Sequence, residues 1–212
     1  MNLLIVAATE LEIAPFLKDI KSKNRGIDIL IGGVGMVATA YALGRKLSEK
    51  RYDAVINIGI AGSFDKTLEL GAVVRVQSDA FSELGAENDQ SFLSIDEMGF
   101  GKSVFNENAI PFLNLPSVIK LKCVNSITVN TVHGNQESID RVSLRLNPEI
   151  ENMEGASAFY AAQQRGIYSL QIRSISNLVE KRDRSNWQID LAIHNINNWL
   201  IEFVSEVYQK NL

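Results

Sequence analysis

Short apolar runs alternate with amphipathic segments from the first residues of the chain. Residues 3–8 form a continuous apolar run, which is typical of a strand buried on both faces. Thr9 and Glu12 follow with the spacing of a capping box, a pattern that begins a helix. Two more strands are predicted at residues 27–31 and 54–58, and a helix is predicted between them at residues 36–50. This order predicts an α/β protein with a mainly parallel sheet.

The pattern changes in the middle of the chain and then returns to α/β. Alternating β-type runs at 73–76 and 118–129 predict strands, separated by a polar loop that holds residues 97–101. Two helices and a strand are predicted at 138–146, 155–164 and 169–175. From Ile189 to Val207 the apolar positions recur every three or four residues, which predicts a long helix packed on the sheet. With no repeat or linker visible, we expect one domain over residues 1–212.

Composition restricts the possible partners. The 212 residues are 46% hydrophobic and 22% charged, which is ordinary for a globular protein. The net charge is −4 and no segment concentrates Lys and Arg, so we expect no nucleic-acid partner. The run at 3–8 is too short for a signal peptide, and no apolar stretch is long enough to span a membrane. Together with the single cysteine, Cys123, expected as a reduced and buried thiol, this predicts a cytoplasmic protein without a membrane partner.

Ligands of open α/β sheets bind beyond the carboxyl ends of the strands, so the residues after each strand matter most. Gly33, Gly35 and Ala38 match the dinucleotide fingerprint in letters, but they follow the second strand. The acid expected after the next strand is also missing, because Asp53 precedes that strand. We therefore interpret the glycines as a turn that lets strand and helix pack closely.

Two glutamates stand at the starts of helices. Taken singly, Glu12 is the partner in a capping box, and Glu154 is an acid favoured by a helix dipole. Their significance changes when they are read together with the segment 173–177, which closes a strand. Four segments, in the same order and spacing, resemble the superfamily that contains purine nucleoside phosphorylases and methylthioadenosine/S-adenosylhomocysteine nucleosidases. They are residues 33–38, 55–62, 153–155 and 173–177.

Further segments resemble one family within this superfamily, the futalosine hydrolases. They are residues 7–10, 83–87, 128–132 and 176–187. The resemblance implies a phosphorylase-like three-layer fold with a central mixed, mainly parallel sheet flanked by helices. It also implies hydrolysis of the N-glycosidic bond of futalosine to hypoxanthine and dehypoxanthinyl futalosine in menaquinone biosynthesis, without a cofactor or metal. The expected partner is a small-molecule nucleoside, and the expected assembly is a homo-oligomer, with a dimer favoured.

The resemblance gives roles to several residues. Glu12 would take a proton from the attacking water, and Glu154 would accept hydrogen bonds from the ribose hydroxyls, with Met153 against the sugar. Such bonds strengthen as positive charge builds on the ribose in the transition state. Arg173 would donate near the water or would instead pair with a neighbouring acid, and both alternatives stay open. The loop after the first strand offers no Arg or Lys for a phosphate, so we expect hydrolysis rather than phosphorolysis.

Asn177 stands where the adenine-specific nucleosidases carry Asp. The two N–H donors of its amide would suit N7 and O6 of hypoxanthine. Arg182, Arg184 and Trp187 would hold the carboxyphenyl tail of futalosine, or would form a solvated loop. His133 is a further candidate near the base, whereas His194 is expected at the surface or in helix packing.

Two other functions remain open. One is a methylthioadenosine/S-adenosylhomocysteine nucleosidase, which Asn177 argues against. The other is a nucleoside-binding protein without activity, which would have no need for Glu12 as a base.

Overall fold

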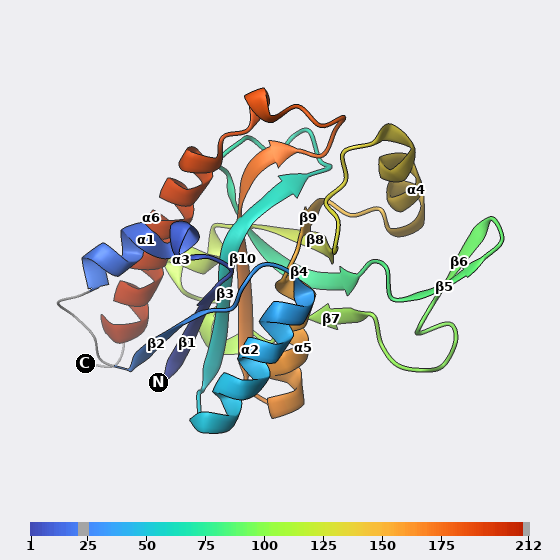
Figure 1. Ribbon diagram of the computed structural model, residues 1–212. Coiled ribbons are helices and arrows are strands. Elements are labelled where there is room, and N and C mark those ends of the chain that lie inside the picture. Colours follow the sequence, from blue (N-terminus) through green and yellow to red (C-terminus); the bar gives the residue numbers. More distant parts are fainter. Residues whose placement is uncertain (21–25, 210–212) are drawn as a thin grey trace.

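The computed structural model describes residues 1–20 and 26–209. This part of the chain forms ten strands and six α-helices, which alternate near both ends of the chain and not in its middle (Figure 1). The strands are β1 (Leu3–Ala7), β2 (Ile27–Ile31), β3 (Ala54–Ser63), β4 (Val73–Phe81), β5 (Gly85–Asn88), β6 (Ser91–Ser94), β7 (Val104–Asn106), β8 (Lys122–Thr128), β9 (Ile150–Asn152) and β10 (Tyr168–Leu178). The helices are α1 (Glu10–Ile20), α2 (Met36–Glu49), α3 (Pro116–Ile119), α4 (Gln136–Leu146), α5 (Gly155–Arg165) and α6 (Ile189–Gln209), with short 3-10 turns η1 (Ile110–Phe112) and η2 (Arg184–Asn186).

Both faces of the sheet are covered, as the continuous apolar runs require. Successive side chains of a strand point to opposite faces, and in β1 Leu3 and Ile5 join one buried cluster while Leu4 and Val6 join another. Helices α1, α3 and α6 pack on the first face, and α2 and α5 on the second (Figure 1). The predicted arrangement of a central sheet flanked by helices is confirmed.

The strands pair in the order β10-β4-β8-β9-β3-β1-β2, and β7 adds to β4. β10 also pairs with β3, so five of the strands close on themselves while β1 and β2 extend from β3. Most pairs are parallel; the antiparallel ones are β10 with β4, β3 with β9, and β4 with β7. The sheet is therefore mixed and mainly parallel, as predicted. β5 and β6 form a separate hairpin that projects from the body (Figure 1).

The structure corrects some of the expected bounds. The run 118–129 is not one strand, because Pro116 begins the short helix α3 and β8 starts only at Lys122. Proline fits the first position of a helix, where its missing N–H has no partner to lose. Cys123 is half-buried rather than buried, and its Sγ accepts a hydrogen bond from Nη2 of Arg75 (2.9 Å). Within the described residues, no helix has the length and apolar character needed to cross a membrane.

Candidate active site

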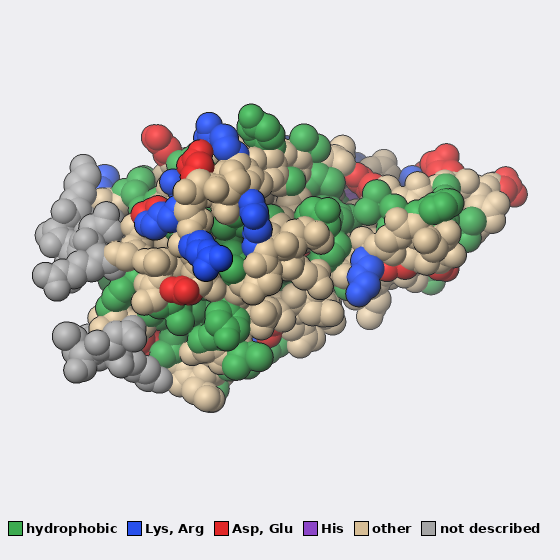
Figure 2. All heavy atoms as spheres, turned by 90° about the horizontal axis from the view of Figure 1, so that it is seen from below, with side chains coloured by type: hydrophobic (Ala, Val, Ile, Leu, Met, Phe, Trp, Pro, Cys, Tyr) green, Lys and Arg blue, Asp and Glu red, His purple; other side chains and the backbone are tan. Residues whose placement is uncertain are grey.

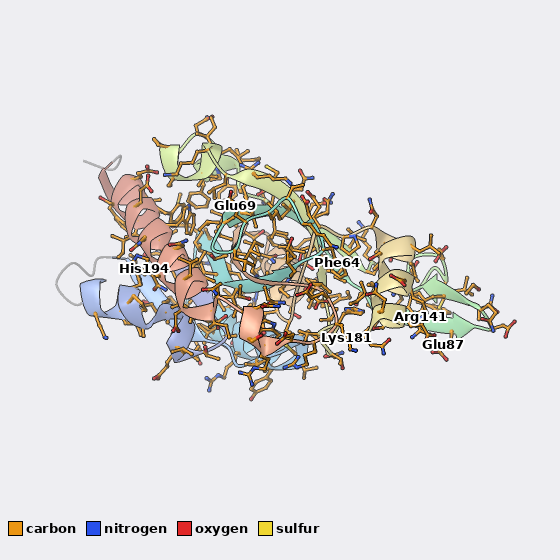
Figure 3. All side chains as sticks on the ribbon, turned by 90° about the horizontal axis from the view of Figure 1, so that it is seen from above. Phe64, Glu69, Glu87, Arg141, Lys181 and His194 are labelled. Atoms are coloured by element: carbon orange, nitrogen blue, oxygen red, sulfur yellow. The ribbon has the colours of Figure 1, made fainter. Side chains whose placement is uncertain are left out.

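A cavity of about 370 Å³ opens at the edge of the sheet where the parallel strands end. Figure 3 looks down on this edge, marked by Phe64, which follows β3, and Lys181, which follows β10. The sequence-predicted residues that line the cavity are Glu12, His133, Met153, Glu154, Asn177, Arg182 and Trp187. Arg173 and Arg184 are not in its lining. The strand order has thus brought together residues from the beginning, middle and end of the chain.

Glu12 lies in the first turn of α1, directly after β1. The predicted capping box is confirmed: Thr9 N donates to Glu12 Oε2 (2.9 Å), and Glu12 N donates to Thr9 Oγ1 (3.3 Å). The other carboxylate oxygen accepts a bond from Ile60 N (3.4 Å) on β3. Only 8% of Glu12 is exposed, yet it faces the cavity. The cap therefore holds a carboxylate at the cavity wall in one orientation.

Glu154 is the N-cap residue of α5 and is also 8% exposed. Its Oε1 accepts a hydrogen bond from Gly35 N (3.0 Å), in the glycine turn before α2. Gly35 has φ of 95°, a conformation that favours glycine. Gly33, the other turn glycine, also has positive φ, and a Cβ built on it would lie 3.0 Å from Ala38 Cβ. This agrees with the interpretation of the turn as a close contact between strand and helix.

Arg173 is fully buried on β10, and its charge interacts with both glutamates. A Cβ built on Gly59 would lie 2.9 Å from both Arg173 Nη1 and Glu12 Oε1, so the bare glycine gives both groups their room. Arg173 Nη2 donates to Asn57 Oδ1 (2.6 Å) and Asn152 Oδ1 (3.1 Å). Its closest hydrogen-bond partners are therefore amides, and no ion pair within 4.0 Å joins it to an acid among the described residues.

Asn152 connects this arginine to a second buried acid. Its Oδ1 also accepts bonds from Glu154 N (2.9 Å) and Gly155 N (2.6 Å), so it caps α5. Its Nδ2 donates to Asp79 Oδ2 (2.7 Å), and Asp79 is fully buried. Because Arg173 and the two backbone N–H groups can only donate, they fix Oδ1 as the end of the Asn152 amide that faces Arg173.

Burial raises the pKa of the two buried carboxyl groups and lowers the pKa of Arg173. Loss of water raises the pKa of Glu154 above 4.5, and the charge of Arg173 opposes part of that rise. Burial likewise raises the pKa of Asp79, against hydrogen bonds from Gln171, Asn152 and Thr128. The pKa of Arg173 is lowered by burial, while Glu154, Glu12 and Asp79 favour its charged form. One buried cation thus faces three carboxyl groups.

Asn177 reaches the cavity from the end of β10. The pairing of β10 with β3 shifts register between Ile175 and Asn177, and the bulge turns Asn177 toward Gly62. Its Oδ1 accepts a bond from Ser176 Oγ (2.8 Å), and its Nδ2 donates to the carbonyl of Leu178 (2.9 Å). The amide therefore keeps one N–H for a ligand, whereas the sequence suggested two.

The loop after β10 places an arginine and an indole at the cavity. Arg182 Cζ lies 5.0 Å from the centroid of the Trp187 ring, and both residues line the cavity. Arg184 Cζ lies 5.7 Å from the same ring but outside the lining. A cation and an aromatic ring are thus available together at one side of the cavity.

One residue of the site, Glu151, was missed from sequence. Glu151, only 3% exposed, lines the cavity beside Asn152, and its Oε2 lies 2.5 Å from Nδ1 of His133. β9 has just three residues, all buried, so no alternating pattern reveals it. His194, by contrast, is exposed on α6 as expected and lies outside the cavity.

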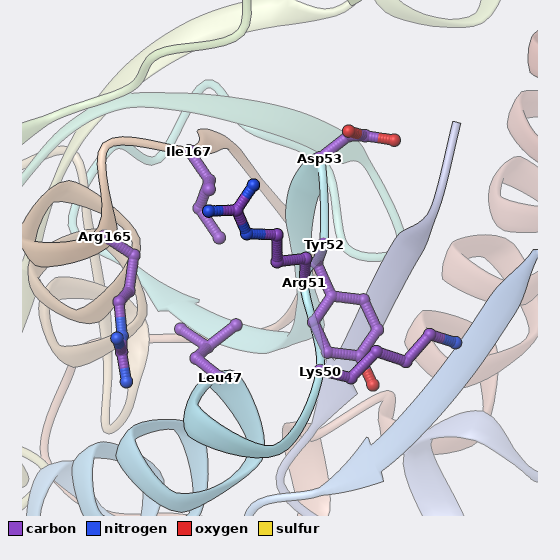
Figure 4. Close-up of a pocket in the computed structure, with 7 residues that line it drawn as sticks. All are labelled: Leu47, Lys50, Arg51, Tyr52, Asp53, Arg165 and Ile167. Carbon is purple, nitrogen blue, oxygen red and sulfur yellow. The ribbon is translucent and has the colours of Figure 1, made fainter.

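A second hollow of about 390 Å³ lies at the opposite edge of the sheet, where β3 and β10 begin. Basic side chains gather on this side of the molecule, which Figure 2 shows from below. Figure 4 shows Arg51 and Arg165 around an apolar floor that includes Leu47 and Ile167. None of the sequence-predicted site residues lies there. Cations near the C-terminal ends of α2 and α5 are also favoured by the helix dipoles. The carboxyl-edge cavity is therefore the candidate active site.

Known proteins resemble this chain in sequence and in fold. A sequence model of the phosphorylase superfamily matches residues 4–205. The futalosine hydrolase of Streptomyces coelicolor is 30% identical over 174 residues, which is 79% of this chain and 74% of that protein. The futalosine hydrolase of Thermus thermophilus is 27% identical over 202 residues, 90% of this chain and 89% of that protein.

Two solved structures from Helicobacter pylori match the fold across nearly the whole chain. A 5'-methylthioadenosine/S-adenosylhomocysteine nucleosidase superposes with a TM-score of 0.84 at 17% identity, covering 97% of this chain and 98% of that one. A futalosine hydrolase superposes with the same TM-score, identity and coverage. At this level of identity the two structures establish the fold, and they do not separate the two activities.

Proposed function

Because the chain belongs to the phosphorylase superfamily, we propose that it is an N-glycosyl hydrolase that cleaves futalosine with water into hypoxanthine and dehypoxanthinyl futalosine, a step of menaquinone biosynthesis. The observation that carries the proposal is the arrangement of Glu12 and Glu154 in one cavity, with the buried Arg173 interacting electrostatically with both. The sequence similarity to futalosine hydrolases gives the substrate.

The two glutamates support two different roles. Glu12 would accept a proton from a water molecule as the water oxygen attacks C1' of the ribose and the bond from C1' to the base nitrogen breaks. Glu154 would accept hydrogen bonds from the ribose hydroxyls, with Met153 against the sugar. Met153 also packs on a core cluster, so it can be both a wall of the cavity and a core residue. As the bond breaks, positive charge develops on the ribose and the carboxylates stabilise it.

The charges of the cavity favour water over phosphate as the nucleophile. Three carboxylates line it, those of Glu12, Glu151 and Glu154, whereas Arg182 is the one cation of its lining among the described residues. Arg173 lies behind Glu12 and is engaged with two asparagine amides. A phosphate dianion at Glu12 would meet a like charge, while a neutral water would find an acceptor.

The loop after β10 supports recognition of the tail of futalosine. Arg182 can bind its carboxylate, and the Trp187 indole can stack on its phenyl ring. Arg184 lies next to the same ring and is a second candidate for the carboxylate. Within the described residues no cluster of His, Cys, Asp or Glu could hold a metal ion, and the proposed reaction needs no cofactor. We further propose a cytoplasmic homo-oligomer, with a dimer favoured.

Product analysis tests this function against the nucleosidase alternative. The purified protein is incubated with futalosine and with methylthioadenosine, and the released bases are identified by chromatography. We expect hypoxanthine from futalosine at a much higher rate than adenine from methylthioadenosine. Faster release of adenine would reverse the assignment, and release of neither base would favour a binding protein.

A further inference from the structure

The hydrogen bonds of Asn177 leave part of a hypoxanthine base without a partner. The N7 and O6 atoms of the base are acceptors, and N1–H is a donor, whereas N1 of adenine is an acceptor. Asn177 has one N–H left for N7 or O6, because the other is donated to Leu178. Its oxygen is already engaged by Ser176 Oγ. With that N–H on N7, the N1–H on the opposite side of the base is left for a second group to bind.

Glu151 lies on the other side of Gly62 from Asn177. In the sheet, Gly62 of β3 pairs with Asn177 of β10 on one side and with Glu151 of β9 on the other. A Cβ built on Gly62 would lie 3.1 Å from Asn177 Nδ2 and 3.6 Å from Glu151 Cγ. The two side chains thus come from two neighbouring strands and flank one bare glycine at the cavity wall.

His133 holds this carboxylate in place. Its backbone N donates to Glu151 Oε1 (3.0 Å), and its Nδ1 lies 2.5 Å from Glu151 Oε2. Because an ionised carboxylate can only accept, the proton of this contact belongs on Nδ1. Phe64 packs edge-on against the His133 ring, with centroids 6.1 Å apart, which further fixes its position.

We propose that Glu151 and His133 form the base-selecting pair of this site, in which His133 positions the Glu151 carboxylate and this carboxylate accepts the N1–H of a 6-oxopurine. Both residues line the cavity, and an ionised Glu151 carboxylate presents only acceptors to it. A 6-oxopurine brings a donor to such a surface, while a 6-aminopurine brings the lone pair of N1. The inference rests on the proposed function for the identity of the base and adds the residues that select it.

Binding of the free bases tests the pair separately from catalysis. The dissociation constants of hypoxanthine and adenine are measured by calorimetry for the wild type, Glu151→Gln and the control Glu137→Gln, whose side chain is 80% exposed on α4. We expect the wild type and the control to prefer hypoxanthine by about tenfold or more. In Glu151→Gln the amide can donate to N1 of adenine, so the preference should fall by about tenfold or more.

The outcomes separate this inference from the proposed function. Hypoxanthine release from futalosine by the wild type tests the function alone. An unchanged ratio of base affinities in a folded Glu151→Gln protein, or a wild type that prefers adenine, overturns the pair whatever the activity. If Glu151→Gln does not fold, His133→Leu carries the same test, because leucine has no donor, so the carboxylate loses its Nδ1 contact and the preference should again fall.

Discussion

Replacing Glu12 with glutamine removes a proton acceptor from the cavity while keeping the size of the side chain. The glutamine oxygen can still accept the bonds from Thr9 N and Oγ1, so the helix cap is retained. The amide nitrogen then faces Ile60 N, and the long bond of 3.4 Å at this position is lost. That loss costs about 1 kcal/mol, which in a domain of this size lowers Tm by about 2–4 °C.

The catalytic effect should be much larger than the structural one. Removing a general base lowers turnover by about 10² or more, equivalent to about 2.7 kcal/mol of transition-state stabilisation. The assay measures kcat for futalosine and Tm for Glu12→Gln and for the control Glu10→Gln, an exposed acid of the same helix turn. Turnover near the wild-type rate in the Glu12 variant would show that this residue is only a cap and would refute the mechanism.

Three further predictions address the tail, the base and the pH dependence. Arg182→Ala should raise KM for futalosine far more than KM for inosine, which has no carboxylate. Arg184→Ala should have a smaller effect, because Arg184 lies outside the cavity lining. Equal effects on both substrates in steady-state kinetics would show that this loop does not recognise the tail. Asn177→Asp puts an acceptor opposite an acceptor of hypoxanthine, which costs about 1–3 kcal/mol. The ratio of kcat/KM for futalosine to that for its 6-amino analogue should therefore fall, and a constant ratio would contradict the role of Asn177. Because burial raises the pKa of Glu154 above 4.5, Glu154 loses its ionised form at a pH above 4.5 as the pH falls. The acid limb of the kcat/KM profile should lie above pH 4.5 and shift in Glu154→Gln.

The fold could be predicted largely because its signals are local. The apolar run of β1 and the capping box of Thr9 and Glu12 depend on neighbouring residues, and both are found in the structure. β9 could not be predicted because its three residues are buried by contacts with β3 and β8, which are distant in the sequence. The short helix α3 also went unseen, since Val118 and Ile119 fit the alternation of the strand that follows.

Site residues could be predicted where they belong to a local sequence motif. They could not be predicted where their position depends on the pairing of strands that are distant in the sequence. Glu12 and Glu154 follow the ends of strands and meet in the cavity. Glu151 has no such signal, because its position beside Asn177 arises from the pairing of Gly62 with two strands at once. The hydrogen bond from the Asn177 amide to the carbonyl of Leu178 likewise lies at a bulge that the sequence does not show.

The central claim is that water, rather than phosphate, cleaves futalosine at this cavity. The most direct measurement incubates the purified protein with futalosine in phosphate-free buffer and in the presence of phosphate, and identifies both products by mass spectrometry. We expect hypoxanthine and the free sugar dehypoxanthinyl futalosine, formed at the same rate in both buffers. A rate that depends on phosphate, with a sugar 1-phosphate as product, would contradict the account.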